Sequence, residues 1–140
     1  VKGNREVILA SHKLEEAKAF ALQLGGLAKA AEVPAAIKEA DIVVMAVWFN
    51  TIQELLKQYA TELQGKIIVD PSNPIAPDGN GGFKKIISVD ESAGQIISGL
   101  LPKGTKLAKA LGTLGAASLA SAANQKPEAA VLFYATDETS

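Results

Sequence analysis

Residues 41–50 read Asp-Ile-Val-Val-Met-Ala-Val-Trp-Phe-Asn, and this stretch decides the fold. The uniformly apolar run from Ile42 to Val47 is rich in β-branched residues and follows one acidic residue. A run this short is typical of a strand that is buried on both faces, as in a parallel sheet covered by helices. A buried helix is the alternative, but Asn50 opens a separate helical pattern directly afterwards. We therefore predict a central strand, and ligands of open parallel sheets bind beyond the carboxyl ends of such strands.

Strand-like and helix-like segments alternate along the rest of the chain. A strand is expected at residues 6–10, 66–70, 105–110 and 129–136, with a brief edge strand at 27–30. Apolar residues recur at helical spacing within residues 13–24, 34–40, 51–63 and 91–101, and residues 115–123 form a small-residue helix or turn. The loop at residues 78–82 is expected to be mobile or tightly turned. This alternation with short connections predicts an α/β fold with a mostly parallel sheet.

Composition narrows the class of protein. The chain has 140 residues, a hydrophobic share of 48% and a net charge of −1, which fit one globular domain with a core and do not favour nucleic-acid binding. There is no cysteine and only one histidine, so disulfides, thiolate nucleophiles and a metal site are not expected. The sequence shows neither a membrane span nor a signal peptide, so we expect a cytoplasmic protein. Both ends look cut, which predicts a single, incomplete domain over residues 1–140.

The first group of candidate site residues is Ser11-His12-Lys13, directly after the strand at residues 6–10. Basic residues at such a strand end accept the 2′-phosphate of NADP, whereas an acidic residue there binds the ribose hydroxyls of NAD. The structural alternative is that Ser11 caps the following helix and that the next two residues are solvated. Both explanations remain open from the residues alone.

The second group is Trp48-Phe49-Asn50, at the end of the central strand. Aromatic side chains in a strand-end loop can form the wall of a site for a flat ring. They can equally cover the hydrophobic edge of the sheet.

The third group is Asp70-Pro71-Ser72-Asn73-Pro74, which follows the strand at residues 66–70. The two prolines prevent regular structure and hold the segment rigid. Asn73 can then offer its amide and backbone groups to a ligand carboxamide, or it can simply suit the turn. No catalytic triad, carboxylate pair or phosphate-binding lysine loop accompanies these groups.

Together these stretches resemble the family of NADP oxidoreductases that use a deazaflavin coenzyme. This family is related to pyrroline-carboxylate reductases and to the cytosolic domain of membrane ferric reductases. The similar segments are residues 7–13 (Val-Ile-Leu-Ala-Ser-His-Lys), 41–48 (Asp-Ile-Val-Val-Met-Ala-Val-Trp) and 67–74 (Ile-Ile-Val-Asp-Pro-Ser-Asn-Pro). Residues 109–116 are similar to the family's Lys-Ala-Phe-Asn-Thr segment, although Leu111 and Gly112 depart from it.

The resemblance implies a Rossmann-like, doubly wound sheet with helices on both faces and NADP(H) at the strand ends. Ser11, His12 and Lys13 would bind the 2′-phosphate, Asn73 and Pro74 would lie near the nicotinamide, and the cofactor would run along Ala46, Val47, Trp48 and Phe49. The implied reaction is hydride transfer between NADPH and a small-molecule redox partner, either a deazaflavin or a flavin. The protein then supplies orientation and needs no obligatory acid or base. The catalytic residues stay unassigned, and a homodimer is possible.

One departure from the family affects both fold and function. The family begins with a strand and a Gly-x-Gly-x-x-Gly turn, which cradles the pyrophosphate roughly 20–30 residues before the position of Ser11. This sequence lacks that unit, so the first strand is missing between the strands at residues 6–10 and 41–47. We expect another chain, a swapped segment or direct pairing of these two strands to fill the gap. The alternative function is a non-catalytic dinucleotide- or protein-binding module, or an inactive truncated remnant.

Overall fold

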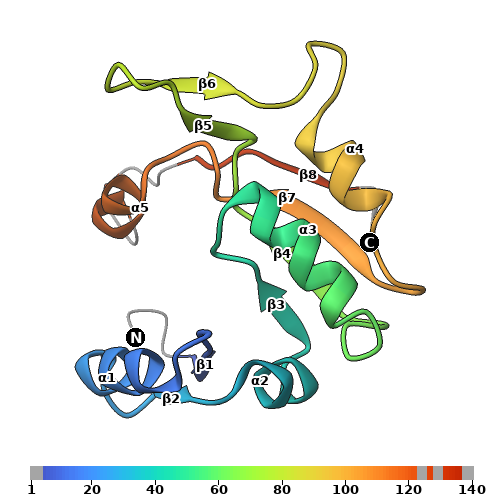
Figure 1. Ribbon diagram of the computed structural model, residues 1–140. Coiled ribbons are helices and arrows are strands. Elements are labelled where there is room, and N and C mark those ends of the chain that lie inside the picture. The colour runs from blue at the N-terminus through green and yellow to red at the C-terminus, as the bar shows by residue number, and fades with distance from the viewer. Residues whose placement is uncertain (1–4, 123–125, 128–130, 137–140) are drawn as a thin grey trace. The chain divides into compact units, whose positions relative to one another are not determined.

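The computed structural model describes residues 5–122, 126–127 and 131–136, and the chain forms two compact units, Val1–Asp41 and Ile42–Ser140 (Figure 1). Within the described part of the chain, no helix has the length and apolar character needed to cross a membrane.

The first unit is built from two parallel strands and two helices. Strand β1 pairs with β2 so that Val7 lies opposite Ala28. Helix α1 ends as the sequence predicts, because Gly25 takes a φ of 89° and its amide donates to the Ala21 carbonyl at 3.2 Å. The elements are β1 (Val7–Leu9), α1 (Leu14–Leu24), β2 (Ala28–Ala30) and α2 (Val33–Glu39). The strand and helix predictions for residues 6–40 are therefore confirmed.

The beginning of α1 differs from the prediction that Ser11 caps the helix. The N-cap is Lys13, whose side chain makes no capping hydrogen bond. Ser11 instead accepts a hydrogen bond at its Oγ from the Lys13 amide, at 3.3 Å. A serine hydroxyl readily bonds the amide two residues on, and this local turn delays the helix.

The second unit contains a four-stranded sheet in the order β3-β4-β7-β8, in which β3, β4 and β7 are parallel and β8 is antiparallel to β7. A separate hairpin joins β5 to β6. The strands are β3 (Ile42–Val44), β4 (Ile67–Asp70), β5 (Ile75–Pro77), β6 (Phe83–Lys85), β7 (Lys106–Ala110) and β8 (Tyr134–Thr136). The helices are α3 (Phe49–Gln58), α4 (Ala93–Ser98) and α5 (Ala116–Ala122). The predicted final strand at residues 129–136 is shorter than expected, and its residues 129 and 130 lie outside the described residues.

The two faces of this sheet differ in burial. Ile68 of β4 lies beside Leu107 of β7, and Asp70 lies beside Lys109, so these side chains share one face. Helix α4 contacts β7 and α3. Buried apolar side chains from both helices and from β4 and β7 form the core of this unit. The fully buried members of this core are Ile52, Leu56, Leu63, Ile68, Ile97 and Asp70. The opposite face carries Ile42, Val44 and Ile67, which are exposed.

The central strand is therefore shorter and more exposed than predicted. We predicted a strand buried on both faces from Ile42 to Val47, but β3 ends at Val44, and Ile42 and Val44 are 55% and 52% exposed. Beyond Met45 the amide of Val47 donates to the Met45 carbonyl at 2.8 Å, which turns the chain away from the ladder. The apolar character of residues 42–47 does not indicate that β3 lies at the edge of its sheet.

Within the first unit β1 pairs with β2, and within the second unit β3 pairs with β4. The expected filling of the gap next to β3, by another chain, a swapped segment or direct pairing of β1 with β3, stays a prediction.

The β5–β6 hairpin encloses the loop at residues 78–82. Oδ1 of Asp78 accepts hydrogen bonds from the amides of Asn80, at 2.7 Å, and Gly82, at 3.0 Å. These two bonds hold the pKa of the Asp78 carboxyl below its usual value. The loop is thus tightly turned, one of the two alternatives that the sequence left open.

Candidate functional site

The carboxyl ends of the parallel strands β3, β4 and β7 lie at one edge of the sheet. The segments that leave this edge are residues 45–50 after β3, 71–74 after β4 and 111–115 after β7. Residues 71–74, the exit loop of β4, and residues 45–50 contain the candidate site residues of the second unit. This is the edge where ligands of open parallel sheets bind.

A buried ion pair lies where β4 and β7 end. Asp70 is fully buried, and its Oδ1 accepts a hydrogen bond from the Ser72 amide at 2.7 Å. The Lys109 ammonium lies 3.4 Å from Oδ2 of Asp70 and donates to the carbonyls of Asp70, at 3.1 Å, and Ser72. Both Oδ2 of Asp70 and Oγ of Ser72 are buried without a hydrogen-bond partner within the described residues, so Lys109 meets Oδ2 as an ion-pair contact only. The sequence analysis did not predict this ion pair. Its only indication in the sequence is one charged residue near the end of each of the two strands, β4 and β7.

Asn73 links the same two strand exits from the other side. Its Nδ2 donates to the Gly112 carbonyl at 3.0 Å. Leu111 takes a φ of 68°, a left-handed conformation uncommon for leucine, and so turns the chain toward the exit loop. A Cβ added to Gly112 would lie 2.8 Å from the Pro71 carbonyl oxygen. Gly112, which departs from the family segment, therefore permits a close approach of the two backbones.

Replacing Gly112 by Ala is expected to destabilise the protein by about 1–3 kcal/mol, because the added methyl group forces the exit loop outward. Urea denaturation measures the change. Gly115→Ala is the matched control, since nothing lies within 4 Å of a Cβ at that position. Equal effects of the two substitutions would contradict the close approach.

The two aromatic residues that follow β3 differ in their exposure. Trp48 is 61% exposed, whereas Phe49 is 2% exposed and packs in the core as the first residue of α3. Trp48, Phe49 and Asn50 line a small pocket of about 170 Å³. Its other side is formed by the hairpin region, through Ile75, Ala76, Pro77 and Ile86. Only Trp48 is thus exposed enough to offer a ring face to a ligand, and Ala46 and Val47 beside it are also exposed.

Ser11, His12 and Lys13 lie in the first unit, directly after β1. His12 and Lys13 are exposed, and the Lys13 ammonium forms an ion pair with Glu16 at 2.9 Å. The hydrogen bond to Glu16 raises the pKa of Lys13 above its usual value, and the same bond lowers the pKa of Glu16. Lys13 therefore keeps its positive charge, but an anionic ligand has to compete with Glu16.

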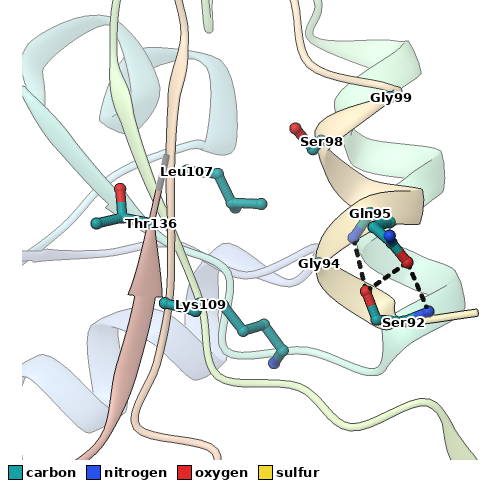
Figure 2. A pocket seen from close by; sticks show the side chains of 9 residues that line it. Ser92, Gly94, Gln95, Ser98, Gly99, Leu107, Lys109 and Thr136 are labelled. Carbon is teal, nitrogen blue, oxygen red and sulfur yellow. Dashed lines mark hydrogen bonds between the residues drawn. The ribbon is translucent and has the colours of Figure 1, made fainter. Parts of the chain in front are cut away.

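A larger pocket of about 450 Å³ lies between α4 and the strands β7 and β8 (Figure 2). Leu107 and Lys109 approach it from β7, and Gln95 and Ser98 approach it from α4. Figure 2 also shows the bonds by which the side chain of Ser92 and that of Gln95 cap α4, with Ser92 Oγ accepting from the Gln95 amide at 3.1 Å. No group of three or more His, Cys, Asp or Glu side chains that could bind a metal occurs in the part of the chain that is described.

Comparisons with known proteins agree with the resemblance seen in the sequence. Residues 1–74 match the model of the family described as "NADP oxidoreductase coenzyme F420-dependent". A hypothetical protein from Sinorhizobium meliloti is 30% identical, with a TM-score of 0.82 over 96% of this chain and 63% of its own. A proposed F420-dependent NADP reductase from Arthrobacter sp. FB24 is 21% identical, with a TM-score of 0.78 over 98% of this chain and 65% of its own.

The search of curated proteins found no match. The chain spans just under two thirds of the length of both solved structures, and their likeness confirms the Rossmann-like α/β fold. Because the family model covers more than half of the sequence, this chain belongs to the F420-dependent NADP oxidoreductase family.

Proposed function

We propose that the protein binds NADP(H) through residues that follow its parallel strands and takes part in hydride transfer between NADPH and a second redox carrier. Coenzyme F420, a deazaflavin, is the first candidate for that carrier, and a flavin is the second. One observation carries the proposal: every candidate cofactor-binding residue lies within the matched residues 1–74, at most five positions after the end of a strand that belongs to a parallel pair.

The residues after β1 suit the phosphate end of the cofactor. The hydroxyl of Ser11, the imidazole of His12 and the ammonium of Lys13 are adjacent, and no acidic residue occurs between Glu6 and Glu15. The Lys13–Glu16 ion pair is exposed, and exposed pairs of this kind contribute little free energy. A phosphate with nearly two negative charges can therefore displace Glu16 at small cost.

The residues after β3 and β4 suit the ring end. The exit loop holds Asn73 between two prolines, and its carboxamide carries an oxygen that can accept from the carboxamide of a nicotinamide. Trp48 offers an exposed aromatic face. NADPH would supply the hydride, and the second carrier would accept it together with a proton from water. The work left to these residues is to orient the rings and exclude solvent.

The middle of the cofactor has no matching element here, because the 140 residues contain no Gly-x-Gly-x-x-Gly turn. The backbone amides that bind a pyrophosphate are usually the main source of dinucleotide affinity at this fold. The second candidate function is a binding module without catalysis.

Fluorescence titration of a chain that carries the family's glycine-rich unit, with NADPH and with NADH, tests the proposal. We expect NADPH to bind at least about tenfold more tightly, because charge-assisted hydrogen bonds are stronger than neutral ones. Equal affinity, or no binding of either cofactor, would contradict it. Loss of the visible absorbance of oxidised F420 or of FMN on mixing with NADPH then identifies the carrier. NADPH binding without reduction of either would support the binding module instead.

A further inference from the structure

We propose that Lys109 is a positioning residue that holds the exit loop of β4 at the carboxyl edge of the sheet and so presents Asn73 and Pro74. The part of this inference that concerns the cofactor rests on the proposed function. The part that concerns the loop does not.

The contacts of the Lys109 ammonium are all with the end of β4 and its exit loop. Its ammonium donates to the carbonyls of Asp70 and Ser72 and lies 3.4 Å from Oδ2 of Asp70. An ammonium has three N–H donors, and these three oxygen atoms all belong to the end of β4 and its exit loop. Lys109 itself lies on the neighbouring strand β7, directly beside Asp70. It therefore ties one strand exit to the next strand.

The exit loop depends on such contacts because it has few amide donors of its own, although the carbonyls of Asn73 and Pro74 accept hydrogen bonds from the amides of Ile75 and Ile86, each at 2.9 Å. Pro71 and Pro74 have no amide donor, and the Ser72 amide is already used by Oδ1 of Asp70. Asn73 is exposed as a residue, yet its side chain reaches Gly112. Lys109, within β7, and Gly112, after it, thus hold the loop through contacts on Ser72 and Asn73.

The burial of Asp70 explains why the contact has to be charged. Its carboxyl is fully buried, and Oδ2 has only the Lys109 ammonium as a counter-charge among the described residues. Removing the lysine alone would leave a buried carboxylate without compensation, which disrupts a protein strongly. A test must separate this cost from the effect on the loop.

The decisive variant is therefore the double substitution Asp70→Asn with Lys109→Met, which removes both charges together. Lys109→Arg keeps a cation with several donors, and Lys103→Met, at an exposed lysine before β7, is the matched control. The first measurement needs no cofactor: amide hydrogen exchange of Ile75 and Ile86, whose amides donate to the carbonyls of Asn73 and Pro74 in the loop. We expect exchange to be at least about tenfold faster in the double variant, and close to wild type in Lys109→Arg and Lys103→Met.

The second measurement is the affinity for NADPH in the same set. We expect the double variant to bind NADPH about tenfold more weakly with an unchanged melting temperature, and Lys109→Arg to recover most of the loss. Wild-type exchange rates in the double variant would overturn the proposal for the loop. Faster exchange with unchanged NADPH affinity would overturn the proposal for the cofactor.

Two further outcomes can be distinguished from these results. If the wild type does not prefer NADPH, the proposed function fails, and the exchange rates alone decide the role of Lys109. If the double variant does not fold, ¹⁵N correlation spectra of the wild-type lysine ammonium groups decide it. A held Lys109 ammonium gives a slowly exchanging signal, whereas its absence would contradict the contacts that carry the proposal.

Discussion

Replacing Ile68 by Ala is expected to destabilise the protein by about 2–5 kcal/mol, whereas Ile67→Ala should cost about 1 kcal/mol or less. The two residues are neighbours in β4 and undergo the same chemical change. Ile68 is fully buried against the helices, and Ile67 is 38% exposed on the other face. Urea denaturation followed by circular dichroism measures both free energies of unfolding.

The comparison also tests the one-sided burial of the sheet. Ile42 and Val44 lie on the same face as Ile67, and all three are exposed. A large loss of stability in Ile67→Ala would mean that this face is covered in solution, in contradiction to the exposure described. Ile42→Ala would then have a similarly large effect.

Most elements of the fold could be predicted from the sequence because local patterns determine them. The α3 helix has Ile52 and Leu56 four positions apart on its buried side, and Gly25 stops α1 through a conformation that glycine adopts easily. The position of β3 could not be predicted in the same way. An apolar run shows that a strand is favourable, but only the pairing of β3 with β4 shows that it lies at an edge.

The sequence did not predict the β5–β6 hairpin, for a related reason. β5 and β6 are short, and β6 is exposed throughout, so neither produces the alternation of a half-buried strand. The bonds from Asp78 to Asn80 and Gly82 close the loop, and the register follows from that turn rather than from a hydrophobic pattern.

The same distinction, between local patterns and contacts of distant residues, applies to the candidate site. The sequence placed Trp48 and Asn73 in the segments after β3 and β4, although β3 ends three residues earlier than predicted. It did not reveal that Phe49 is buried beside the exposed Trp48, or that Asp70 meets Lys109, which is 39 positions away along the chain. Contacts between distant residues depend on the strand order, and no local pattern contains that order.

Under the proposed function the charge after β1 determines the choice between NADP and NAD, so the double substitution His12→Ala with Lys13→Ala is expected to weaken NADPH binding. With two charge-assisted contacts discounted for exposure, the loss should be on the order of tenfold to a few hundredfold, and NADH binding should barely change. Titration of a chain that carries the family's glycine-rich unit, which restores the pyrophosphate site, measures both affinities. Removing Lys13 also breaks its ion pair with Glu16, so the stability of the variant has to be measured alongside.

Lys18→Ala is the matched control for that effect, because Lys18 forms the other exposed ion pair of α1, with Glu15 at 2.7 Å and at the same spacing. We expect it to leave both affinities unchanged. Ser11→Asp should go further than the alanines and reverse the preference, since a carboxylate repels the 2′-phosphate and accepts from the ribose hydroxyls of NAD. An equal loss of affinity for NADPH and NADH in the double alanine variant would show that His12 and Lys13 support the fold of the first unit. A loss confined to NADPH would show that the end of β1 recognises the phosphate.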